Sequence, residues 1–168
     1  YIVQVEERVL AEGERVIGKS EVTLPVYDEQ GNRFVRFQET AIGNFCTDAF
    51  RIMLDTDIAM INGGGIRNDI PQGSVTFNTM YSVFPFNNTV CTASLTGAQL
   101  ADAVEVSVMC LPEEDGGFMQ VSGVRFKVNT AIATPVVLDE NNIFSHVGGG
   151  ERRVSGIEIL NKSTGEYL

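Results

Sequence analysis

The sequence has one histidine, His146, no tryptophan and only three cysteines among its 168 residues. Cys46, Cys91 and Cys110 are widely spaced and form no CxxC pair. A zinc site built from several histidine and cysteine ligands is therefore excluded. Because the number of cysteines is odd, a fully paired set of internal disulfides is also excluded, and we expect buried, unreactive thiols.

Positive charge and long apolar runs are scarce as well. The chain carries 12 lysines and arginines against 22 acidic residues, for a net charge of −10. Such a chain is repelled by nucleic acid polymers and by anionic membrane surfaces, so neither is an expected partner. No stretch approaches the roughly 20 apolar residues of a membrane span. A small anion can still bind where several arginines converge, because contact geometry outweighs net charge.

Hydrophobic residues make up 43% of the chain, which is enough to build one packed domain. Apolar residues at helical spacing predict helices over residues 2–12, 40–54 and 96–110, with one further helical turn within 76–86. Thr40 is the expected N-cap of the second helix, and Thr96 with Gln99 has the spacing of a capping box. Strands are expected over residues 15–26, 57–62, 88–95, 118–129 and 151–160. Their irregular interleaving with helices indicates an α+β fold with a mixed β-sheet.

The segment INGGGIR, residues 61–67, follows one of these strands. It matches neither the dinucleotide-binding pattern nor the P-loop pattern. The glycines predict a sharp turn with backbone angles open only to glycine, whose N–H groups face a cavity and beyond which Arg67 projects. A plain structural turn with a solvated arginine is the alternative.

Two other positions carry side chains suited to nucleotide binding. Arg36 can bind phosphate or carboxylate with two parallel hydrogen bonds, although a surface arginine on a strand is the alternative. Phe86 follows Pro85 and precedes two asparagines, so its ring can stack on a nucleobase, unless it is a core residue near a turn. We expect His146 and the acidic run 113–115 to have no catalytic role.

Four segments occur in a characteristic order: ETAIGNFCTDAFR, INGGGIRNDIPQGSVTFNTMYSVFPFNNTV, LTGAQLADAVE and GGFMQVSGVRF. Together they resemble the C-terminal domain of the 5′-nucleotidase family, which includes UDP-sugar hydrolases and 2′,3′-cyclic nucleotide phosphodiesterases. The resemblance implies an interdomain linker helix over residues 1–13. Residues 14–168 would then form the substrate-binding domain, truncated at its C-terminus.

The resemblance also implies a division of labour between two domains. In the family, an N-terminal metallophosphoesterase domain of the same chain holds two divalent metal ions and hydrolyses the substrate, while the C-terminal domain binds the nucleotide or nucleoside. A chain with one histidine cannot furnish a two-metal site, so we expect no catalytic residue, metal or cofactor here and no activity from this domain alone. Family members mostly act in the periplasm, at the cell surface or after secretion.

Two arginines of the sequence match family residues that hold the phosphate and ribose region of the substrate. These are Arg36 and Arg67. Some members have another substrate arginine four residues before the one matched by Arg36. That position is Asn32 here and Arg33 is its neighbour, so the grip on phosphate is expected to differ.

The base is expected to lie against Phe86, which matches one of two phenylalanines that sandwich it in the family. Asn62 and Asn88 match asparagines that contact the substrate in some members, and Gly116 matches a glycine near the base. The second phenylalanine belongs to a GGDGF/Y segment that this sequence does not contain. Half of the base clamp is therefore expected to be absent.

The resemblance leaves alternatives open. The parent protein is a metal-dependent nucleotidase, or the same domain serves a UDP-sugar hydrolase, a cyclic-nucleotide phosphodiesterase or a sulfur-oxidation hydrolase. A non-catalytic nucleotide-binding or surface module that retains the fold is the remaining alternative.

Overall fold

The computed structural model describes residues 10–168, so the linker helix expected over residues 1–13 lies mostly outside the described residues, of which 10–13 are helical. The remaining elements, with η denoting a short 3-10 helix, are β1 (Val16–Ser20), η1 (Phe34–Arg36), α2 (Ala41–Met53), β2 (Ala59–Asn62), η2 (Gly63–Gly65), β3 (Gly73–Thr76), α3 (Phe77–Val83), α4 (Gly97–Ser107), β4 (Met119–Ser122), β5 (Val124–Val128), β6 (Val136–Leu138), β7 (Phe144–Val147) and β8 (Val154–Ile159). No helix in this part of the chain has the length and apolar character needed to cross a bilayer.

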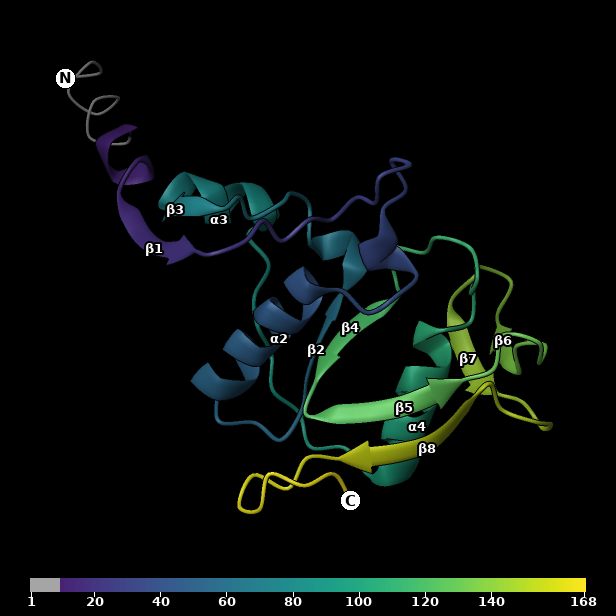
Figure 1. The fold of residues 1–168 in the computed structure, drawn as a ribbon. Helices are drawn as coiled ribbons and strands as arrows, with labels where there is room; N and C mark the ends of the chain where they lie inside the picture. Colours follow the sequence, from purple (N-terminus) through teal and green to yellow (C-terminus); the bar gives the residue numbers. More distant parts are fainter. Residues whose placement is uncertain (1–9) are drawn as a thin grey trace.

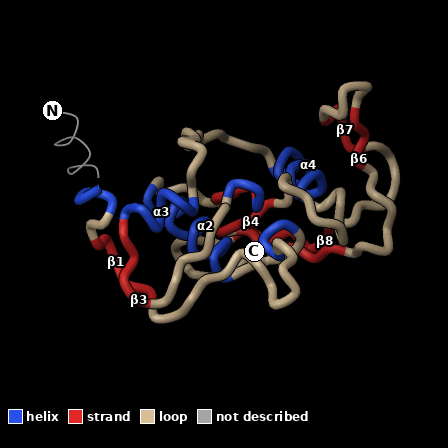
Figure 2. Tube along the Cα trace, turned by 90° about the horizontal axis from the view of Figure 1, so that it is seen from above, coloured by secondary structure: helices blue, strands red, loops and turns tan. Residues whose placement is uncertain are grey.

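The α+β class is confirmed, and its strands associate in antiparallel pairs rather than in a single mixed sheet. Among the described residues, β1 pairs with β3, β2 with β4, β5 with β8 and β6 with β7. The β1–β3 pair and α3 lie at one end of the molecule, and the β6–β7 hairpin lies at the other (Figures 1 and 2). Between them, α2 packs on β2 and β4, and α4 packs against β8.

Both long helices begin where the sequence predicts. The Thr40 hydroxyl accepts a hydrogen bond from the Gly43 N–H at 3.1 Å and caps α2. Thr96 and Gln99 form a reciprocal capping box at the start of α4. These caps satisfy N–H groups that a helix leaves unpaired in its first turn.

Two hydrophobic clusters form the core. The first lies around α2, η1 and the glycine turn and comprises Val26, Val35, Ile42, Cys46, Ile66, Ile70, Val75 and Val83. The second joins α4 to β5 and β8 and comprises Leu100, Val104, Val108, Phe118, Val124 and Val154. Strands β2 and β4 run between these two clusters, so hydrophobic packing from both clusters fixes the position of this strand pair.

Three of the expected strands differ from the structure. The strand expected over residues 15–26 is shorter, because β1 ends at Ser20 and beyond it only Leu24 forms an isolated bridge, with Ile70. The strand expected over residues 118–129 is divided into β4 and β5 at Gly123, whose φ of 78° breaks the extended backbone. The strand expected over residues 88–95 is wrong: this exposed segment forms no ladder with the described residues. Residue composition favoured a strand there, but a strand also requires backbone hydrogen bonds to a neighbour, and the segment forms none with β2, which pairs only with β4 among the described residues.

The glycine turn is shaped by close packing. None of the three glycines has a positive φ, so the expectation of glycine-only backbone angles is wrong. Instead, a Cβ at Gly63 would lie 2.1 Å from the carbonyl oxygen of Val35, and one at Gly64 would lie 2.9 Å from that of Gly116. The Gly63 N–H donates to Phe118 O, and the Gly64 N–H donates to Gly116 O. These two N–H groups therefore hold neighbouring backbone rather than facing a cavity.

Substitution of Gly63 tests this packing. We expect Gly63→Ala to lower the free energy of unfolding by about 1–3 kcal/mol, because the added methyl group meets a backbone carbonyl that cannot rotate away. Gly97→Ala is the matched control, since a Cβ there meets nothing within 4 Å, and should change stability by less than about 0.5 kcal/mol. Urea unfolding followed by circular dichroism measures both. Equal stability of the two variants would contradict the packing account.

The cysteines differ in burial, and the expectation of buried thiols is wrong for Cys91, which is exposed. Burial raises the pKa of Cys46 to about 12. At pH 8 we expect an aromatic disulfide reagent to label Cys91 quickly and to leave Cys46 unlabelled until the chain unfolds, because the thiolate is the reactive form. A Cys91→Ser variant assigns the fast phase. Rapid labelling of Cys46 in the folded chain would refute the prediction.

Candidate functional site

Two arginine side chains donate hydrogen bonds to backbone carbonyl groups at the glycine turn. Arg33 Nη2 donates to the Ile66 carbonyl oxygen at 2.7 Å, and Arg67 Nη1 donates to that of Gly64 at 3.3 Å. Burial, with the charges of Arg36 and Arg67 nearby, lowers the pKa of the Arg33 guanidinium from its ordinary value. Three cationic side chains therefore share one side of the turn, and we call Arg33, Arg36 and Arg67 the arginine cluster.

The arginine cluster has unused capacity to bind an anion. Within residues 10–168, no carboxylate forms an ion pair with any of the three guanidiniums. The carboxylate of Glu114 lies nearby and accepts a hydrogen bond from the Arg33 backbone N–H at 2.8 Å. The Nε atoms of Arg33 and Arg36 are buried and have no hydrogen-bond partner among the described residues. A buried donor without a partner is costly. The two side chains are only half-buried, so an anion at their accessible N–H groups would add charge-assisted hydrogen bonds.

An exposed aromatic ring borders the cluster. The ring of Phe86 is 54% exposed, and the Arg67 guanidinium carbon lies 5.4 Å from its centroid. The Arg67 N–H donates to the carbonyl oxygen of Val83, the last residue of α3. Since the guanidinium covers part of the ring, a planar ligand would find the rest of Phe86 open for stacking beside a positive charge.

The loop around Gly116 completes the wall of the site. Asn62 Nδ2 donates to the Gly116 carbonyl oxygen at 3.0 Å, and the Gly64 N–H donates to the same oxygen at 3.0 Å. The Asp115 N–H donates to Arg36 O at 3.1 Å. The Asn62 amide therefore joins the glycine turn to this loop, and the loop in turn contacts the backbone of the arginine cluster.

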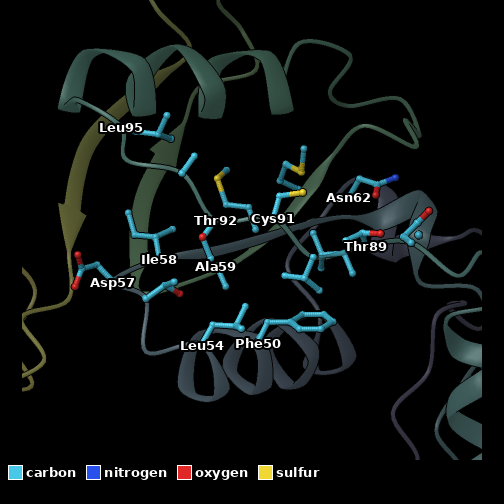
Figure 3. A pocket seen from close by; sticks show the side chains of 18 of the residues that line it. Phe50, Leu54, Asp57, Ile58, Ala59, Asn62, Thr89, Cys91, Thr92 and Leu95 are labelled. Carbon is cyan, nitrogen blue, oxygen red and sulfur yellow. The ribbon is translucent and has the colours of Figure 1, made fainter.

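A groove of about 1280 Å³ adjoins the site, lined by α2, β2 and residues 86–97. In Figure 3, Phe50 of α2 and Leu54, the C-cap of that helix, lie across from Cys91 and Thr92. Ala59 of β2 lies between them. None of the three arginines lines it. The groove is mostly apolar and meets the site at Asn62, Gly65 and Phe86, so an anionic ligand is favoured at the arginine cluster instead.

The described residues do not fit a metal centre. No three His, Cys, Asp or Glu side chains come together in residues 10–168 as ligands of one ion. His146 lies exposed on β7. The side chains described around the glycine turn therefore offer guanidinium groups and an aromatic ring rather than a group of metal ligands.

The structure places most of the expected site residues around one turn. Arg36, Arg67, Phe86, Asn62 and Gly116 lie around η2, whereas Asn88 lies farther along the wall of the groove.

Arg33 was missed as a site residue, although its spacing carried a signal. It is the N-cap of η1, and residues three apart lie over one another on a 3-10 helix. Arg33 therefore lies on the same side as Arg36. The family's two arginines are four residues apart, which is the spacing that brings side chains together on an α-helix.

Comparisons with known proteins identify the family of the chain. A family model described as "5′-nucleotidase, C-terminal domain" matches residues 16–163. The trifunctional nucleotide phosphoesterase protein YfkN of Bacillus subtilis is 35% identical over 114 residues, covering 66% of this chain and 8% of that protein. Cell wall protein Lmo0130 of Listeria monocytogenes is 31% identical over 106 residues, covering 56% and 13%.

A solved structure shows the same fold along nearly the whole chain. The crystal structure of a 5′-nucleotidase precursor from Thermus thermophilus matches with a TM-score of 0.74 and 28% identity, covering 99% of this chain and 29% of that one. The chain thus spans less than a third of the length of each of these relatives. By its matching segments and its fold, it belongs to the 5′-nucleotidase C-terminal domain family.

Proposed function

We propose that this domain binds nucleoside phosphates for a 5′-nucleotidase-type phosphohydrolase. The arginine cluster takes the phosphate, and Phe86 stacks on the base. The observation that carries the proposal is the meeting of three guanidiniums, none of them in an ion pair with a carboxylate of the described residues, beside an exposed aromatic ring. An isolated anion such as sulfate would use the cluster alone, whereas a nucleotide uses both parts.

Hydrolysis belongs to another part of the protein in this proposal. The described residues supply positive charge and a stacking surface but no metal ligands in a group. Two divalent metal ions on an N-terminal metallophosphoesterase domain would supply the hydrolytic chemistry. This domain would present the phosphoester to them, because a substrate held in a fixed orientation reacts faster than one that diffuses freely.

The proposed location is outside the cytoplasm, in the periplasm, at the cell surface or in the medium. One relative is named a cell wall protein, and the solved structure is of a precursor. Extracellular nucleotides are charged and cross membranes poorly, so a phosphohydrolase placed there would release nucleosides for uptake.

Titration with AMP tests the site directly. We expect the chain to bind AMP with a dissociation constant on the order of millimolar. Arg67→Ala should weaken binding roughly tenfold or more, because it removes charge-assisted hydrogen bonds, and Phe86→Ala should weaken it less. Changes in NMR chemical shifts during the AMP titration give the dissociation constant of each variant. The control is Arg15→Ala, which removes one charge from an exposed ion pair with Glu12. Shift changes confined to residues far from the glycine turn would overturn the assignment.

Arg33 provides a second test, which separates the phosphate from the base. We expect Arg33→Ala to weaken binding of AMP by several-fold, on the order of 1 kcal/mol, and to leave the affinity for adenosine unchanged, because Arg33 belongs to the phosphate side of the site. Parallel titrations with AMP and adenosine measure this difference. An equal loss of affinity for both ligands would indicate that the substitution distorts the turn instead.

A further inference from the structure

A buried glutamine lies behind the arginine cluster. Gln120 on β4 is 1% exposed. Its Nε2 donates to Val35 O at 2.9 Å and to Gln38 O at 2.7 Å. Its Oε1 accepts from the N–H and the hydroxyl of Thr40 at 3.1 and 3.2 Å. Both donors and both acceptor positions of the amide are therefore satisfied.

The partners of Gln120 lie on both sides of Arg36. Val35 precedes this arginine in η1, while Gln38 and Thr40 follow it and lead into α2. A single side chain thus fixes the backbone before and after Arg36. The carbonyl oxygens of Val35 and Gln38 accept hydrogen bonds from the Gln120 amide. Loss of this amide would leave them without these hydrogen bonds, which is costly inside a protein.

The start of α2 is shaped to admit this amide. A Cβ at Gly43 would lie 1.9 Å from Gln120 Oε1. The Thr40 hydroxyl, which donates to Gln120, also accepts from the Gly43 N–H. The helix cap and the glutamine therefore form one hydrogen-bonded unit.

Strand β4 connects this unit to the other arginine. Gln120 is paired with Ile61 of β2, and Met119 is paired with Asn62, after which the glycine turn begins. Gln120 is thus fixed to the glycine turn by the ladder and to Arg36 by its side chain. These two connections link the segment that carries Arg36 to the glycine turn that precedes Arg67.

We propose that Gln120 is a positioning residue for the anion site, which it reaches only through the Arg36 turn. It holds Arg36 at the separation from Arg67 that lets both guanidiniums contact one phosphate. The inference rests on the proposed function, because it assigns a residue to the same site. Gln120 itself does not touch the ligand, since it is buried behind the turn.

Gln120→Met is the informative variant, because it preserves side-chain length and removes all four hydrogen bonds. We expect it to weaken AMP binding roughly tenfold or more under conditions in which the chain remains folded. Val104→Ala, in the second hydrophobic cluster, is the control for lost stability and should keep the affinity of the unmodified chain. Unchanged affinity in Gln120→Met, or equal losses in both variants, would overturn the proposal.

A double-mutant cycle with Arg36→Ala separates positioning from general damage. If Gln120 acts through Arg36, Gln120→Met should cost little further affinity once Arg36 has been removed. Fully additive losses would show that the glutamine affects binding by another route, which contradicts the proposal.

Amide hydrogen exchange of the ligand-free chain tests the positioning role of Gln120 separately from nucleotide binding. The Asp115 N–H is bonded to Arg36 O, and the Phe37 N–H to Phe34 O. We expect both to exchange faster in Gln120→Met than in Val104→Ala. Unchanged exchange refutes positioning by Gln120, whereas failure of the unmodified chain to bind AMP refutes the nucleotide site alone.

Discussion

The close approach of three backbone segments is the constraint on which the site depends. The glycine turn lies against the carbonyl oxygen of Val35 on one side and that of Gly116 on the other, with no space for a Cβ at Gly63 or Gly64. The segments that carry Arg36, Arg67 and the Gly116 loop therefore form one packed unit. The long arginine side chains gather on one side of this unit because the backbone itself fills its centre.

This packing explains how an acidic chain can present a positive site. The net charge of −10 is spread over the whole molecule, whereas the arginine cluster places three cations around one turn. Carbonyl oxygens of Ile66 and Gly64 partly compensate two of them. At contact distance the guanidinium charges outweigh carboxylates elsewhere on the surface that solvent and salt screen, so the local field decides which ions bind.

Local signals in the sequence were sufficient for α2, α3 and α4, whereas the segments of the candidate site were singled out by their family resemblance. The caps at Thr40 and Thr96 depend on residues three positions apart, so they could be predicted without knowledge of the fold. The role of the glycines could not, because it depends on Val35 and Gly116, which are distant in sequence. The strand expected over residues 88–95 failed for a related reason, since pairing requires a partner that composition does not reveal.

The type of ligand that each site residue suits was easier to predict than the neighbours that the residue contacts in the fold. Arginine and phenylalanine indicate anion binding and stacking wherever they converge. That Arg33 joins Arg36 follows from the 3-10 geometry of η1, and the sequence analysis had not predicted this short helix. The amide of Asn62 was expected to contact substrate, but in the structure it donates to the Gly116 carbonyl.

The groove beside β2 has a consequence for the behaviour of the domain in solution. Among the described residues, β2 is hydrogen-bonded only to β4, so its other edge borders the groove with unpaired backbone groups. An open strand edge can pair with the same edge of another molecule and thereby start aggregation. The acidity of the chain opposes such encounters, because copies that each carry a charge of −10 repel one another. Because salt screens this repulsion, the colloidal stability of the domain decreases as the ionic strength rises.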